Sequence, residues 1–70
     1  MTNSTETILR ANIKKYREKA GLTQEQLSEI AGISPDYLSE IERGKKIPSM
    51  KRFFKIAKAL SIMPYQLLKP

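Results

Sequence analysis

Residues 21–44 read GLTQEQLSEIAGISPDYLSEIERG and contain the start signals of two short helices. Thr23 is placed to cap the first helix, and Gln26, three residues later, completes a capping box. Ser34 is placed to cap the second helix, and Pro35 occupies its first position, where the fixed φ of proline favours a helix start. The segment therefore predicts helices that begin at residues 24 and 35.

Two glycines in this segment supply the stop signals. Gly32 falls at the break between the two helices, and Gly44 falls where the second helix needs a left-handed exit. The apolar residues at helical spacing, which we expect to face inward, are Leu27, Ala31, Ile33, Leu38 and Ile41. Two capped helices joined by a tight turn form a helix-turn-helix unit, which holds its second helix out so that it enters a DNA major groove.

The flanking sequence adds three further helices and no strands. The five predicted helices run from about Thr5 to Ala20, Gln24 to Ala31, Pro35 to Arg43, Met50 to Leu60 and Pro64 to Leu68. Their inward stripes are Leu9, Ile13 and Tyr16 in the first helix, and Met50, Phe53, Ile56, Ala57 and Leu60 in the fourth. We therefore predict an all-α, five-helix domain over residues 1–70, with the helix-turn-helix at about 22–44.

Length and composition narrow the class of protein. A chain of 70 residues has room for one small domain. It contains no cysteine, so neither a disulfide nor a zinc–thiolate site holds it together, and no metal or cofactor is expected. Its apolar stretches are too short to span a bilayer, and residues 1–6 are polar and lack an apolar signal region. The expectation is a cytoplasmic protein without membrane contact.

The charge is basic overall and unevenly distributed. The net charge is +6 and the isoelectric point is about 9.8, which indicates a polyanionic partner. Residues 22–42 carry five acidic and no basic side chains, whereas residues 43–70 carry eight basic and no acidic ones. The positive field therefore comes mainly from the segment that follows the second helix of the helix-turn-helix.

The same residues resemble the phage repressor/Cro-type helix-turn-helix family, also called XRE-like. The matching pattern consists of residues 22–27, 31–34 and 38–44, followed by Pro48 and Ser49, and the resemblance extends over roughly residues 8–68. It implies a repressor-like fold and a regulator of transcription that binds double-stranded DNA in a sequence-specific manner. It leaves two subtypes open: a dimeric phage-type repressor and a controller protein of a restriction–modification system.

The resemblance also implies which residues contact bases. The family's base-reading positions correspond here to Pro35, Asp36, Tyr37 and Glu40. Proline offers only an apolar contact, for instance to a thymine methyl group, and a carboxylate accepts a hydrogen bond from cytosine N4. Tyr37 has an aromatic face for stacking and a hydroxyl to donate. For Asp36 a second interpretation stays open, in which it only stabilises the positive end of the helix dipole.

A second set of residues corresponds to phosphate contacts. Gln24 occupies the first turn of a helix, where its amide adds to the free backbone N–H groups. Ser34 is first a helix cap, and Ser39 lies on the flank of its helix. Arg43, Lys45 and Lys46 form a basic cluster directly after that helix. Lys51 and Arg52 oppose the dipole of the fourth helix, which is easier to understand if an anion lies nearby.

Two further sets are structural. The family pairs an arginine late in its first helix with a glutamate near the end of its third, and Arg17 and Glu42 occupy those positions. Four apolar side chains near the end of the chain exceed what a minimal core needs, and we expect them to form a homodimer surface: Phe54, Tyr65, Leu67 and Leu68. A homodimer would bind an inverted-repeat operator, and no small-molecule effector is expected because no effector domain fits.

The sequence also bears on two other functions. The acidic character of the second helix keeps open an antitoxin-like or regulatory protein-interaction module on the same scaffold. An enzyme is not expected, because the chain has no histidine and no cysteine to act as base, thiol nucleophile or zinc ligand, and it has no glycine-rich phosphate loop.

Overall fold

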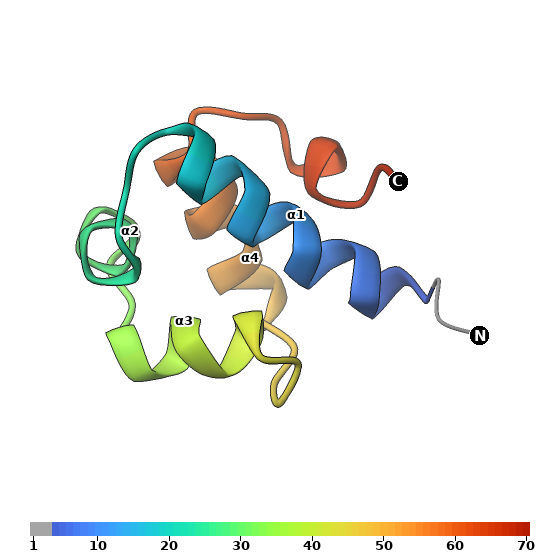
Figure 1. Cartoon of the computed structure of the whole chain (residues 1–70), viewed down its shortest axis with the longest axis horizontal. Coiled ribbons are helices and arrows are strands. Elements are labelled where there is room, and N and C mark those ends of the chain that lie inside the picture. Colours follow the sequence, from blue (N-terminus) through green and yellow to red (C-terminus); the bar gives the residue numbers. More distant parts are fainter. Residues whose placement is uncertain (1–3) are drawn as a thin grey trace.

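A computed structural model describes residues 4–70 of the chain. Within these residues the protein consists of four α-helices and one short 3-10 helix, with no strand (Figure 1). The elements are α1 (Thr5–Lys19), α2 (Gln24–Ala31), α3 (Pro35–Glu42), α4 (Met50–Ala59) and the 3-10 helix η1 (Pro64–Leu67). The all-α class is confirmed, and α2 and α3 form the predicted helix-turn-helix.

The capping residues begin the helices where the sequence predicts. The Thr23 hydroxyl accepts a hydrogen bond from the Gln26 N–H at 3.0 Å, and the Gln26 side chain accepts one from the Thr23 N–H at 2.9 Å. The Ser34 hydroxyl accepts from the Tyr37 N–H at 3.0 Å. Gly32 has a φ of +73°, so the chain turns between α2 and α3 in the left-handed region that glycine adopts without strain.

The predicted fifth helix, a short last turn opened by Pro64, is not an α-helix, so four α-helices are present in residues 4–70. The segment Pro64–Leu67 forms a single 3-10 turn instead. Its hydrogen bonds span three residues, from the Gln66 N–H to the Met63 carbonyl and from the Leu68 N–H to the Tyr65 carbonyl. The carbonyls of Leu67 and Lys69, at the end of this turn, accept hydrogen bonds from a side chain of α1.

The core lies between all five elements. Its fully buried apolar side chains are Ile13, Leu27, Leu38, Ile41, Ile56 and Leu67. The predicted inward stripes are confirmed with one exception, since Met50 is exposed. Met50 is the first residue of α4, and the buried stripe of that helix begins one turn later, at Phe53.

Asn12 ties the end of the chain to α1. This buried side chain donates to the carbonyl of Leu67 at 2.9 Å and to that of Lys69 at 2.8 Å. The segment after α4 therefore lies against α1 (Figure 1). Buried polar groups need such partners, and the two carbonyls satisfy both amide hydrogens.

The arrangement leaves one face of α3 uncovered. Leu38 and Ile41 of α3 pack into the core. The helix runs along one edge of the molecule, at the bottom of Figure 1, and the loop of residues 43–49 leaves its end towards α4. The outer side of α3 and this loop form one continuous surface, which we call the α3–loop surface and define as residues 35–37, 39, 40, 43, 45 and 46. Tyr37 lies at its margin, half-buried against the core.

Candidate nucleic-acid interface

The outer face of α3 presents the predicted base-contacting residues. Pro35 and Asp36 are exposed, and Tyr37 and Glu40 are half-buried. In the first turn of α3, Pro35 has no N–H and the Tyr37 N–H is bonded to the Ser34 hydroxyl, so Asp36 presents its backbone N–H beside its own carboxylate. Apart from one proline, these groups are suited to hydrogen bonding or stacking with a polar partner.

The loop that follows α3 presents the predicted cations. Arg43, Lys45 and Lys46 are all exposed, and Ser39 is half-buried on the flank of α3. Lys46 Nζ lies 3.1 Å from a carboxylate oxygen of Glu40, and these side chains are 48% and 38% exposed. An ion pair at that exposure is worth about 0–1 kcal/mol, so a phosphate could replace Glu40 as the partner of Lys46. The sequence did not indicate this pairing.

Gln24 lies beside α3 through a contact that the sequence did not indicate. Its side-chain amide donates to Glu42 at 2.9 Å. The start of α2 and the end of α3 are therefore adjacent, which places Gln24 near the α3–loop surface. Only one of its two amide hydrogens is needed for Glu42.

The predicted ion pair between Arg17 and Glu42 is confirmed. Arg17 Nε and Nη2 donate to the two carboxylate oxygens of Glu42 at 2.8 and 3.1 Å, and Nη1 donates to the Leu22 carbonyl at 2.8 Å. The side chains are only 11% and 4% exposed. The hydrogen bonds to Glu42 raise the pKa of the Arg17 guanidinium above its ordinary value, against the opposing effect of burial. The pair connects α1 to the end of α3 and fixes the orientation of that helix.

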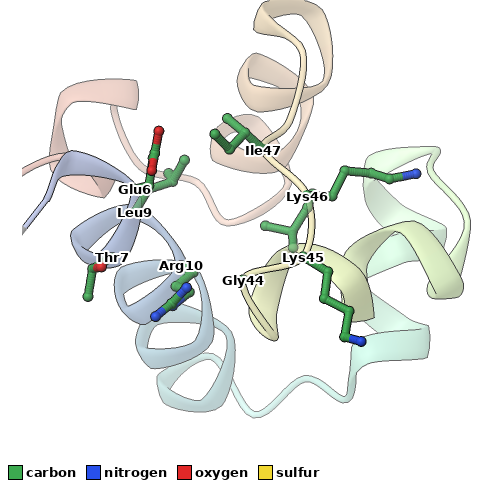
Figure 2. Close-up of a pocket in the computed structure, with 9 residues that line it drawn as sticks. Glu6, Thr7, Leu9, Arg10, Gly44, Lys45, Lys46 and Ile47 are labelled. Carbon is green, nitrogen blue, oxygen red and sulfur yellow. The ribbon is translucent and has the colours of Figure 1, made fainter. Parts of the chain in front are cut away.

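Arg10 was missed by the sequence interpretation. A groove of about 410 Å³ lies between α1 and the loop, and Figure 2 shows Arg10 on the α1 side of it, with Lys45 and Lys46 extending from the loop away from α1. A Cβ atom at Gly44 would collide with the Arg10 guanidinium. Gly44 also has a φ of +78°, so glycine satisfies both the turn and the close approach.

The predicted dimer residues separate into two groups. Phe54, Tyr65 and Leu68 are 51%, 63% and 41% exposed, whereas Leu67 is fully buried. The prediction for Leu67 is wrong because a 3-10 helix repeats every three residues: Tyr65 and Leu68 share one side of the turn, and Leu67 lies on the other, in the core.

The structural role of Asn12 was not predicted from the sequence, although a polar residue in the Leu9–Ile13 stripe signals a buried hydrogen bond.

Residues 4–70 contain neither a metal-binding cluster nor a membrane-spanning helix. No three carboxylate, histidine or cysteine side chains in this range lie close enough to hold a metal ion. In the same range, no helix is long and apolar enough to cross a membrane.

The sequence of the chain matches a helix-turn-helix family and is similar to several regulators. The profile of the family HTH_3, described as helix-turn-helix, matches residues 13–65. The chain is 35% identical over 60 residues to an uncharacterized HTH-type transcriptional regulator, y4dJ of Sinorhizobium fredii, covering 86% of this chain and 78% of that protein. It is 36% identical over 61 residues to the control protein C.SmaI of Serratia marcescens, covering 87% of this chain and 73% of that one.

A solved structure agrees with the sequence relatives. The crystal structure of the restriction-modification controller protein C.AhdI from Aeromonas hydrophila superposes with a TM-score of 0.85 and 31% sequence identity. The superposition covers 89% of this chain and 94% of that one.

Proposed function

The chain belongs to the HTH_3 helix-turn-helix family, and from this premise we propose that it is a transcriptional regulator that binds double-stranded DNA in a sequence-specific manner. The observation that carries the proposal is the α3–loop surface. An uncovered helix face and three exposed cations, Arg43, Lys45 and Lys46, lie side by side in it. A helix inserted into the major groove would place such cations against the phosphate backbone.

In this proposal the outer face of α3 contacts base edges. Asp36 and Glu40 accept hydrogen bonds, which suits the cytosine N4 amino group, and Pro35 suits the thymine methyl group. Tyr37 lies within the same face and is considered further below. The acidic residues discriminate between bases and the loop cations supply affinity, so specificity and affinity come from different parts of the surface.

The phosphate contacts surround this face. Gln24 and Ser34 lie in the first turn and at the cap of their helices, where the positive end of the helix dipole favours an anion. Ser39, Arg43, Lys45 and Lys46 lie on the flank of α3 and in the loop that follows it. We propose that these six residues fix the register of the protein on the duplex without selecting a sequence.

We further propose that the protein acts as a homodimer on an inverted-repeat site. Phe54, Tyr65 and Leu68 remain exposed apolar side chains, on α4 and the segment after it, and none of them belongs to the α3–loop surface. A two-fold contact there would leave both α3 helices free to enter successive major grooves, about 34 Å apart.

C.AhdI is named as a restriction-modification controller protein and C.SmaI as a control protein. These names support the controller subtype over a phage repressor. A regulator that binds chromosomal or plasmid DNA works where that DNA lies, so we place the protein in the cytoplasm.

Selection from a library of random duplexes tests the proposal. The bound fragments should share a palindromic motif. The logarithm of the affinity for that motif should fall linearly with the logarithm of the salt concentration. Fragments without a common motif would contradict sequence-specific binding. A chain that retains a protein partner but has no salt-sensitive affinity for DNA would support the protein-interaction module instead.

A further inference from the structure

Tyr37 makes three contacts that a residue dedicated to base contact would not need. Its hydroxyl accepts a hydrogen bond from the backbone N–H of Ser49 at 3.1 Å. Its ring centroid lies 5.4 Å from Lys46 Nζ and 5.0 Å from Arg52 Cζ. Both distances are within the range in which a cation is attracted to an aromatic face.

The hydroxyl contact fixes the start of α4 to α3. Ser49 is the N-cap of α4, and its own hydroxyl accepts from the Arg52 N–H at 3.3 Å. The hydrogen bonds therefore run from Arg52 through Ser49 to Tyr37. As a result, the first turn of α4 has a fixed position relative to the outer face of α3.

The ring contacts gather two cations from different segments at one point of α3. Lys46 comes from the loop and Arg52 from the first turn of α4, where a cation opposes the helix dipole. Lys46 also pairs with Glu40, which lies three residues after Tyr37 on the same helix face. A guanidinium held over a ring by its charge does not use its N–H donors there, which leaves them for a phosphate.

We infer that Tyr37 is a positioning residue that holds Lys46 and Arg52 beside α3 as a pair of phosphate-binding cations, which adds Arg52 to the DNA-contacting residues. The inference rests on the proposed function. It also explains how a helix in the acidic segment of residues 22–42 approaches a polyanion, because the two cations offset its carboxylates at the point of contact.

The test compares affinities for a fluorescein-labelled duplex of random sequence over a range of salt concentrations. The variants are Arg52→Gln, Tyr37→Leu, their combination and Tyr37→Phe. Arg52→Gln should weaken binding and reduce the slope of log affinity against log salt by about 0.9, which is one phosphate contact. Between 50 and 200 mM salt, the ratio of wild-type to variant affinity should therefore fall by about 3-fold.

The role of Tyr37 appears in the combination. Tyr37→Leu keeps an apolar side chain but removes the ring, so it should also flatten the slope, and the loss caused by Arg52→Gln should shrink at least about 2-fold in that background. Tyr37→Phe keeps the ring and should retain the wild-type slope. A matched control is Tyr16→Leu, because Tyr16 has Lys15 Nζ at the same 5.4 Å on α1, and it should leave the slope unchanged.

A measurement on the free protein accompanies the binding data. The Arg52 side-chain Nε–H resonance should carry a ring-current shift that is lost in Tyr37→Leu and kept in Tyr37→Phe. If Arg52→Gln costs as much affinity with Leu at position 37 as with tyrosine, the inference is overturned while the proposed function stands. If Tyr37→Leu changes the preference at one base pair and leaves the affinity for random duplexes unchanged, Tyr37 is a base-contacting residue and the inference is overturned. A wild-type chain that binds no duplex DNA overturns both.

Discussion

Replacing Arg17 by alanine should destabilise the domain severely. The substitution removes three hydrogen bonds and leaves the Glu42 carboxylate, which is 4% exposed, with Gln24 as its remaining donor. Removing one partner of a buried ion pair costs about 3–5 kcal/mol. Since Arg17 is at the more exposed end of the pair, at 11%, water can reach the site, and we expect the lower value, about 3 kcal/mol.

That loss is large for a chain of this size. A domain of 70 residues has a free energy of unfolding of about 4–10 kcal/mol. A loss of about 3 kcal/mol lowers the midpoint of thermal unfolding by roughly 12–24 °C in a domain of this length. Folding raises the pKa of Arg17 above its ordinary value, so the stabilising contribution of Arg17 is fully present below the ordinary pKa and is lost only as the pH rises through the raised pKa. The difference in stability between the wild type and Arg17→Ala should therefore stay constant around neutral pH.

Thermal and urea unfolding, followed by circular dichroism, measure the effect. Lys19→Ala is a matched control, because it removes an exposed cation from the last turn of the same helix and should change stability by less than about 0.5 kcal/mol. The double variant Arg17→Met with Glu42→Leu should lose less than the sum of the two single variants, since neither charge is left buried alone. An unchanged midpoint for Arg17→Ala would refute the reasoning, because the pair would then contribute nothing to stability.

The remaining predictions concern DNA binding and assembly. Replacing Lys45 and Lys46 by alanine should weaken binding to all duplexes and flatten the slope of log affinity against log salt by about 1.8, which is two phosphate contacts. Replacing Lys55 and Lys58, which are exposed on α4, should not change the slope. Equal slopes for the two double variants in a salt titration would contradict the phosphate role of Lys45 and Lys46. Glu40→Ala should relax the preference at one base position of each half-site, worth about 1–3 kcal/mol, and should raise the affinity for random duplexes because it frees Lys46; retained specificity in a repeat of the library selection would make Glu40 a general electrostatic group. Phe54→Glu with Tyr65→Glu should convert a dimer into a monomer without loss of folding, since both side chains are exposed; sedimentation decides this, and a wild-type chain that stays monomeric with and without operator DNA contradicts it.

The features that the sequence predicted are local. Thr23, Gln26 and Ser34 act on groups within three residues along the chain, so the helix starts follow from the order of residues alone. The apolar spacing predicts which faces are buried for the same reason. The pairing of Arg17 with Glu42 came from the resemblance to a family, because no local rule connects residues 25 positions apart.

The features that the sequence did not predict depend on tertiary packing. The 3-10 turn of Pro64–Leu67 is held against α1 by Asn12, which lies more than fifty residues earlier and donates to the carbonyls of Leu67 and Lys69. The buried position of Leu67 follows from that turn. The partners of Lys46, Gln24 and Tyr37 depend on side-chain directions that are set only when α3, the loop and α4 have packed together.

The Asn12 contact also has a kinetic consequence. It joins residues 55 positions apart, and closing a loop of that length costs about 2 kcal/mol more than closing a four-residue turn. The contact should therefore form after the rate-limiting step of folding. Asn12→Ala removes both hydrogen bonds and leaves the buried Leu67 carbonyl without this donor, at a cost of about 2 kcal/mol, so it should speed unfolding roughly 30-fold and leave the folding rate nearly unchanged in stopped-flow experiments. A single amide in α1 would then set the lifetime of the native state rather than the time needed to reach it.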